Sequence, residues 1–114
     1  MQNRSQRIAD QVQQVLAQAL LRLSEEPLFL KTTITEVKIS PDLSCAKVFI
    51  RIWDEKDIDE TMDALQARAK YLRHILARTL NLRITPTLTF IYDRTEMQAQ
   101  KLTSLINQLD HNEK

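Results

Sequence analysis

Residues 58–92 read IDETMDALQARAKYLRHILARTLNLRITPTLTFIY, and this stretch predicts the architecture of the chain. In its first part, apolar residues alternate in steps of four and three, which is the spacing of an amphipathic helix. We expect one long helix over residues 58–80, because Asn81 tolerates the left-handed conformation that often ends a helix. The pattern then changes, and residues 88–92 have the composition of a strand.

The same stretch separates positive from negative charge. No acidic residue occurs between Asp63 and Asp93, and five basic residues lie in that interval: Arg68, Lys70, Arg73, Arg78 and Arg83. The net charge of the whole chain is only +1, so the remainder is net negative. Such a local excess is typical either of a nucleic-acid contact or of an ordinary solvated helix face. On a helical wheel, Arg68 and Arg73 flank the apolar stripe, and the other cations of the helix lie further round.

The remaining elements complete an α+β pattern. We expect a first helix over residues 5–24, two strands over residues 32–40 and 45–53 that form an antiparallel hairpin, and a last helix over residues 97–109. The order α-β-β-α-β-α predicts a three-stranded sheet with the helices on one face. In the first strand, strict alternation would place Thr33, Thr35, Val37 and Ile39 on a common face.

Length and composition indicate one globular domain. The chain has 114 residues, of which 43% are hydrophobic and 27% charged, and we expect a single domain over residues 1–114 with short flexible termini. No apolar run approaches the about 20 residues of a membrane span, so we expect an intracellular protein. The absence of glycine excludes a Gly-rich phosphate loop, and any position with positive φ should be Asn or Asp.

The second strand offers another possible contact with nucleic acid. Lys47, Phe49, Arg51 and Trp53 alternate with apolar residues and therefore share one side of this strand. On an open sheet face such residues can stack bases and hold phosphates. The alternative, which we favour for the two aromatic residues, is that a helix covers them.

No catalytic or metal-binding constellation is recognisable. His74 and His111 are too far apart in sequence to suggest a zinc site, and the acids over residues 54–60 do not have the spacing of a calcium loop. The single cysteine, Cys45, excludes an internal disulfide, and we interpret it as a small packing residue because no base is positioned to activate it. We therefore expect no enzyme activity, no metal and no cofactor.

Several segments together resemble the bacterial ribosome-binding factor A family. They are Arg4-Ser-Gln-Arg7-Ile-Ala, residues 37–50 (VKISPDLSCAKVFI), Tyr71-Leu-Arg73 and residues 82–93 (LRITPTLTFIYD). The resemblance covers almost the full length. It implies a type II KH-like fold and a cytoplasmic, non-enzymatic factor that binds the immature 30S subunit and assists maturation of its 16S rRNA.

The resemblance also marks one departure from the family pattern. Members lack the GxxG loop of ordinary KH domains and have an Ala-x-Gly kink in the long helix. This triplet aligns with Arg68-Ala69-Lys70, so a lysine stands where the family has glycine. Either the kink forms without glycine or this helix is straighter.

These observations lead to one hypothesis and one alternative. We expect a monomer, when free, that binds rRNA through cationic side chains and has no membrane contact. The candidate RNA-binding residues are Arg4, Arg7, Lys47, Arg51, Arg68, Lys70, Arg73, Arg78 and Arg83. The alternative is a protein–protein adaptor that uses an apolar groove between the first helix and the long helix.

Overall fold

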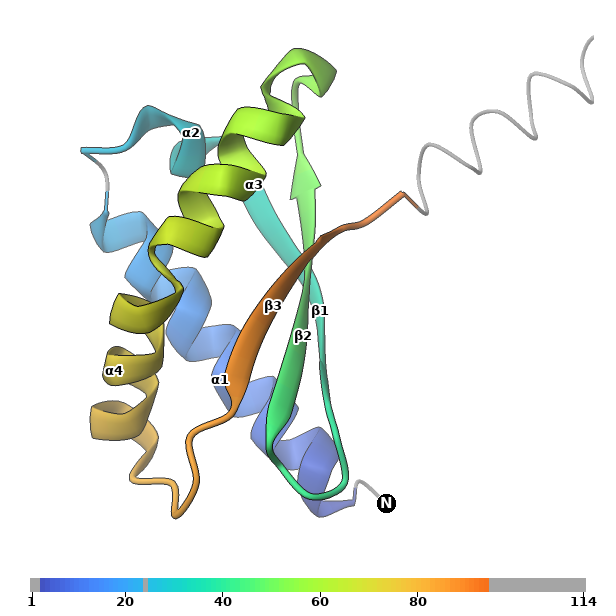
Figure 1. Ribbon diagram of the computed structural model, residues 1–114, viewed down its shortest axis with the longest axis vertical. Helices are drawn as coiled ribbons and strands as arrows, with labels where there is room; N and C mark the ends of the chain where they lie inside the picture. Colours follow the sequence, from blue (N-terminus) through green and yellow to red (C-terminus); the bar gives the residue numbers. More distant parts are fainter. Residues whose placement is uncertain (1–2, 24, 95–114) are drawn as a thin grey trace, which may run out of the picture.

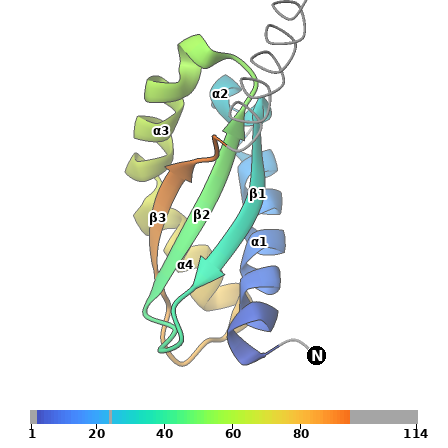
Figure 2. The ribbon, with the colours of Figure 1, turned by 90° about the vertical axis from the view of Figure 1, so that its right-hand side faces the viewer.

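The computed structural model describes residues 3–23 and 25–94. Its helices cover one face of a three-stranded sheet and leave the other face open, as the two views in Figures 1 and 2 show. The predicted order α-β-β-α-β and the one-sided helical layer are confirmed. The helix predicted over residues 97–109 and the chain termini lie outside the described residues.

Helix α1 (Arg4–Arg22) begins at a capping box. The Asn3 side chain accepts a hydrogen bond from the Gln6 backbone N–H at 2.8 Å, and the Gln6 side chain in turn accepts one from the Asn3 backbone N–H. This arrangement satisfies N–H groups that a helix start leaves unpaired. Its buried residues recur at helical spacing: Ala9, Val12, Leu16, Ala19 and Leu20.

A short helix, α2 (Pro27–Leu30), follows and was not predicted. The helix begins at Pro27. Proline suits the first turn of a helix, because its fixed φ is helical and its missing N–H would be unpaired there. Phe29 of this turn is buried in the core.

The sheet consists of β1 (Thr32–Ile39), β2 (Cys45–Ile52) and β3 (Thr87–Tyr92), in the order β1-β2-β3. Strands β1 and β2 are antiparallel, as predicted, and β3 is parallel to β2 because the long helical segment crosses over between them. The strict alternation predicted for β1 is wrong. The register shifts between Ile34 and Glu36, so Ile34 and Val37 are both buried. The extra residue of such a bulge moves the following side chains to the opposite face.

In the part of the chain that the structure describes, two residues have positive φ. Asn81 ends α4 with φ 49° and ψ 43°, which confirms the expected left-handed terminator. The hairpin turn instead has Leu43 at φ 64°, whereas Asn or Asp was expected there. The neighbouring Asp42 supports the turn through its carboxylate, which accepts hydrogen bonds from the Ser40 hydroxyl at 2.7 Å and the Ser44 hydroxyl at 2.8 Å.

The long helix predicted over residues 58–80 is divided in two. After a single 3₁₀ turn, η1 (Glu55–Asp57), α3 covers Ile58–Ala67 and α4 covers Ala69–Leu80, with Arg68 between them. Arg68 has φ −94° and ψ 3°, a conformation that does not require glycine. The kink is therefore made without the family glycine, and Lys70 lies inside the first turn of α4.

The core lies between the sheet and the helical layer. Ala46, Val48, Ile50 and Ile52 of β2 point into it and are buried beneath α1, α3 and α4. Leu65, Leu72 and Leu76 of the divided helix are fully buried on the facing side. The apolar ladder of residues 58–80 is thus the core face, and its other faces remain available to solvent.

Candidate nucleic-acid interface

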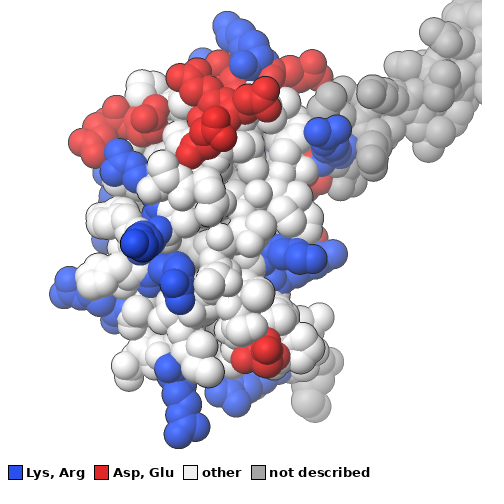
Figure 3. All heavy atoms as spheres, in the orientation of Figure 1, with Lys and Arg blue, Asp and Glu red and all other residues white. Residues whose placement is uncertain are grey.

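Charge is segregated along the length of the molecule. Most acidic side chains in Figure 3 gather at the end where α3 begins, and basic side chains lie over α4 and towards the opposite end. Most of them belong to the turn before α3 and to its first half: Asp54, Glu55, Asp57, Asp59, Glu60 and Asp63. They complement the positive end of the α3 dipole, and they leave the far end of the molecule favourable for anions.

The exposed side of α4 contributes cations to this basic end. Lys70 and Arg78 are exposed, as is His74, whereas Arg68 and Arg73 are only partly exposed. This difference in exposure confirms the helical-wheel prediction that Arg68 and Arg73 flank the apolar stripe and that the other cations lie further round. Tyr71, which the sequence analysis did not include in the candidate site, is 49% exposed beside Lys70. We call Lys70, Tyr71, His74 and Arg78 the α4 surface.

Arg73 has a structural contact. Its Nε donates to the carbonyl oxygen of Pro86 at 3.0 Å, and a terminal nitrogen donates to that of Thr85 at 2.8 Å. Both carbonyls belong to the segment that leads into β3. Arg73 therefore fastens α4 to the start of this strand, and two of its donors are already engaged.

A second group of candidates lies at the end of the molecule opposite the acids. Arg4 and Arg7 are exposed on the first turns of α1, and Arg83 is exposed on the loop between α4 and β3. Arg4 and Arg83 line a common pocket together with residues of the hairpin. The fold thus brings together candidates that are about eighty positions apart in sequence.

The third group lies on the open face of the sheet. Lys47 and Arg51 are exposed there, and Trp53 just beyond β2 is 76% exposed. Our interpretation that a helix covers Phe49 and Trp53 is wrong among the described residues, because α1, α3 and α4 all pack on the opposite face. Phe49 is partly buried by a neighbour that the sequence analysis missed, since the Lys38 ammonium lies 5.4 Å from its ring centroid.

The candidate residues therefore do not form one continuous surface. The α4 surface and the open sheet face lie on opposite sides of the molecule, and the Arg4–Arg83 end adjoins both. The open face carries acids as well, because Glu36 pairs with Phe49 across the strands and the Asp93 carboxylate accepts a hydrogen bond from Thr35 at 2.6 Å. The α4 surface comes from a stretch without acids and is the more favourable for phosphates.

Residues 3–23 and 25–94 were also compared with the requirements of a metal site, a buried cysteine and a membrane-spanning helix. No three His, Cys, Asp or Glu side chains of this part are arranged to hold a metal ion. Cys45 is exposed at the start of β2, which corrects its interpretation as a packing residue. No helix in the same ranges is sufficiently long and apolar to span a membrane.

Three features define this chain as a type II KH-like domain. They are the αββαβ order, the crossover that makes β3 parallel to β2, and the break in the long helix at the position where a KH domain has its loop. Residues 4–106 match the sequence profile of the Ribosome-binding factor A family. The chain belongs to this family.

Individual relatives agree with this assignment. Ribosome-binding factor A of Shewanella sediminis is 38% identical over 109 residues, which are 94% of this chain and 76% of that protein. The Shewanella baltica protein of the same name is 37% identical over 114 residues, covering 98% of this chain and 73% of its own length.

Solved structures show the same fold. The crystal structure of ribosome-binding factor A from Thermus thermophilus superimposes with a TM-score of 0.72 at 27% identity, covering 82% of this chain and 100% of that one. A homology model of the Thermus thermophilus protein, fitted into a cryo-EM map of its complex with the 30S subunit, gives a TM-score of 0.62 at 28% identity. That comparison covers 75% of this chain and 90% of the other.

Proposed function

We propose that this protein binds the immature 30S subunit in the cytoplasm and assists maturation of its 16S rRNA without catalysis. The α4 surface makes the main contact with rRNA phosphates. Family membership supports the choice of partner, as does the Thermus thermophilus relative, whose fitted position is on the 30S subunit.

The observation that carries this proposal is the exposure of Lys70 and Arg78 on an acid-free stretch. Each is exposed on α4, and no acidic residue occurs between Asp63 and Asp93. Phosphates that approach α4 thus meet cations without nearby repulsion from this stretch, and each neutralised phosphate releases condensed counterions. The exposed ring of Tyr71 adds a flat surface on which an unpaired base can stack.

Equilibrium binding is sufficient for such a role. A protein that binds one rRNA conformation more tightly than others raises the population of that conformation by the ratio of the two affinities. The side chains of the α4 surface can hold a folding intermediate in this way.

The experiment that tests this proposal is sedimentation with immature small-subunit particles. The double variant Lys70→Ala with Arg78→Ala should bind at least about tenfold more weakly than wild type, because two charge-assisted contacts are lost. Lys56→Ala is the matched control, since Lys56 is an exposed lysine among the acids before α3. Equal binding by the double variant and the control would refute the proposal.

A second candidate function has one observation in its favour. A groove of about 220 Å³ between α1 and α4 is lined partly by polar side chains and partly by apolar and aromatic ones: Val15, Gln18, Ala19, Arg22, Tyr71, Ile75 and Thr79. An apolar side chain of a protein partner could enter it, as the adaptor hypothesis requires. Tyr71 belongs to both surfaces, so Ile75→Ser separates them. The adaptor function predicts that Ile75→Ser weakens particle binding. It also predicts that added salt leaves particle binding unchanged.

A further inference from the structure

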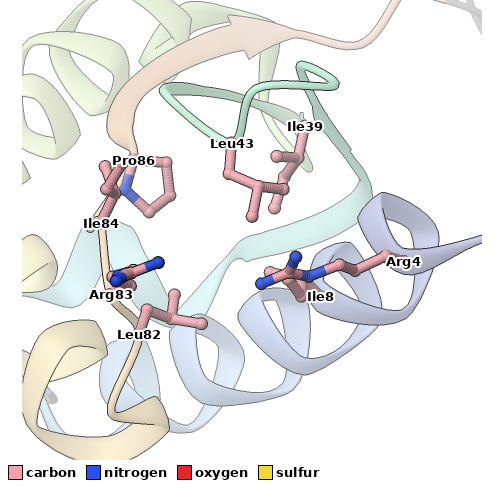
Figure 4. Close-up of a pocket in the computed structure, with 8 residues that line it drawn as sticks. All are labelled: Arg4, Ile8, Ile39, Leu43, Leu82, Arg83, Ile84 and Pro86. Carbon is pink, nitrogen blue, oxygen red and sulfur yellow. The ribbon is translucent and has the colours of Figure 1, made fainter.

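An apolar pocket lies at the end of the molecule opposite the acids of residues 54–63, where three segments meet. Ile8 comes from α1, Ile39 and Leu43 from the hairpin, and Leu82, Ile84 and Pro86 from the loop that precedes β3. Figure 4 shows these side chains directed towards a common space. Its volume is about 210 Å³, below the roughly 300–1,000 Å³ of sites that enclose drug-sized ligands. The pocket suits one ring or one side chain.

Two arginines border this space. Arg4 projects over it from α1 and Arg83 from the loop, and Figure 4 shows their guanidinium groups extending towards each other across the pocket. Neither forms an ion pair with another residue in the described ranges. The first turn of α1 has no acid, so the positive end of this helix adds to the same field.

One acid, Asp42, lies in the hairpin turn beside this pocket. Asp42 precedes Leu43, and its carboxylate accepts hydrogen bonds from the Ser40 and Ser44 hydroxyls and from the Ser44 backbone N–H at 3.1 Å. All three bonds go to the same oxygen, Oδ1, and they lower the pKa of Asp42 to about 2. Within the described residues Asp42 forms no ion pair with Arg4 or Arg83, so the two guanidinium groups remain available for a ligand.

We infer that this pocket binds a single unpaired nucleobase of an RNA strand, with Arg4 and Arg83 holding the phosphates on either side of it. The apolar cavity suits the flat, weakly polar ring of a base. The two cations suit the anionic phosphates on either side of that base in an RNA strand. Guanidinium groups can also stack on the base itself. A duplex cannot present such a base without unpairing it, so the pocket selects single-stranded RNA. The inference rests on the proposed function for the presence of RNA and adds the position and form of a contact.

The first test follows the methyl groups that line the pocket. The full chain is titrated with adenosine 5′-monophosphate, with single-stranded hexaadenylate, with ribose 5-phosphate and with N-acetyl-leucine amide. We expect the Ile8 and Ile84 methyl resonances to shift with the first two and to shift much less with the last two. Equal shifts with ribose 5-phosphate would reduce the site to an anion contact and overturn the inference. Shifts with N-acetyl-leucine amide alone would favour a protein partner and overturn it too, as would no shift with any of the four probes.

The second test uses a matched pair of variants. Ile84 is 57% exposed at the pocket, and Leu30 is 58% exposed on α2 at the other end of the molecule. Ile84→Ser should weaken hexaadenylate binding about tenfold, at the lower end of the cost of losing one stacked base. Its dependence on salt should be unchanged, because no charge is lost, and Leu30→Ser should bind as wild type does.

This pair also separates the inference from the proposed function. If Ile84→Ser and Leu30→Ser bind hexaadenylate equally and the Lys70→Ala, Arg78→Ala variant still loses particle binding, the pocket inference fails and the proposed function stands. If the double variant binds particles normally while Ile84→Ser loses hexaadenylate, the pocket is an RNA site and the α4 surface is not. Arg83→Ala should weaken hexaadenylate binding and also make its salt dependence shallower.

Discussion

The Arg73 Nε lies 3.0 Å from the carbonyl oxygen of Pro86, and this contact fastens α4 to the start of β3. Together with the bond to Thr85, it uses the planar fork of the guanidinium group to hold two successive carbonyls. The predicted RNA-binding arginine in the middle of the basic stretch is thereby also a structural residue. Loss of RNA binding in an Arg73 variant would therefore not by itself show a contact between Arg73 and RNA.

Arg73→Ala should lower the free energy of unfolding by about 2 kcal/mol, the range for hydrogen bonds that involve a charged partner in a partly buried site. Arg73→Lys should recover little of this loss, because one ammonium group cannot donate in two fixed directions. Urea denaturation of the two variants measures the effect. Arg78→Ala, on the exposed side of α4, is the control and should change stability by less than about 0.5 kcal/mol. Equal stability of Arg73→Ala and Arg78→Ala would contradict the structural role.

The Thr61 hydroxyl is fully buried in α3 and has no hydrogen-bond partner within the described part of the chain. Leaving such a group unpaired costs about 1–3 kcal/mol. Thr61→Val keeps the shape and removes the hydroxyl, so we expect the free energy of unfolding to rise by about 1 kcal/mol. A fall in stability on thermal or urea denaturation would show that the hydroxyl has a partner in solution.

Restoring the family glycine should not help this chain. Arg68 already makes the break in a conformation open to any residue, and Lys70 lies within α4. Lys70→Gly should therefore lower the free energy of unfolding by about 0.5–1 kcal/mol relative to Lys70→Ala, the usual cost of glycine in a helix. A Lys70→Gly variant more stable than Lys70→Ala would mean that the kink is strained without glycine.

The Asp42 carboxylate should make the stability of the hairpin depend on acid. Hydrogen bonds from Ser40 and Ser44 lower its pKa from 3.8 to about 2 in the folded protein. Because the folded-state pKa is depressed, its contribution is complete above about pH 4 and is lost as the pH falls towards about 2. Asp42→Ala should therefore lower the melting temperature at neutral pH and have less effect in strong acid. A difference that does not vary between these conditions would contradict this assignment.

The sequence was sufficient for the layers of the fold because residues 58–80 have an unbroken apolar period and the strands are short and distinct. It did not locate the break at Arg68, since the apolar period continues across it and glycine, the usual signal of a kink, is absent. It also did not reveal the β1 bulge. Alternation describes which residues share a face only while the register is constant, and the register depends on pairing with β2.

The sequence predicted which residues are candidates for the site, but it did not predict how they are arranged on the surface. Charge patterning located Lys70 and Arg78 on α4, and the helical wheel gave their exposure. The contact of Arg73 with Pro86 depends on the path of the loop between α4 and β3, and no local sequence pattern predicts that path. The pocket between Arg4 and Arg83 joins the two ends of the described chain, so only the folded structure brings it together.

The central claim is that the α4 surface holds rRNA phosphates, and its most direct test is the salt dependence of binding to immature small-subunit particles. Wild type and Lys56→Ala should show the same linear fall of log affinity with log salt concentration. The Lys70→Ala, Arg78→Ala variant should bind more weakly, with a slope shallower by about 1.4–1.8 because two phosphate contacts are lost. Equal slopes for all three proteins would contradict the account.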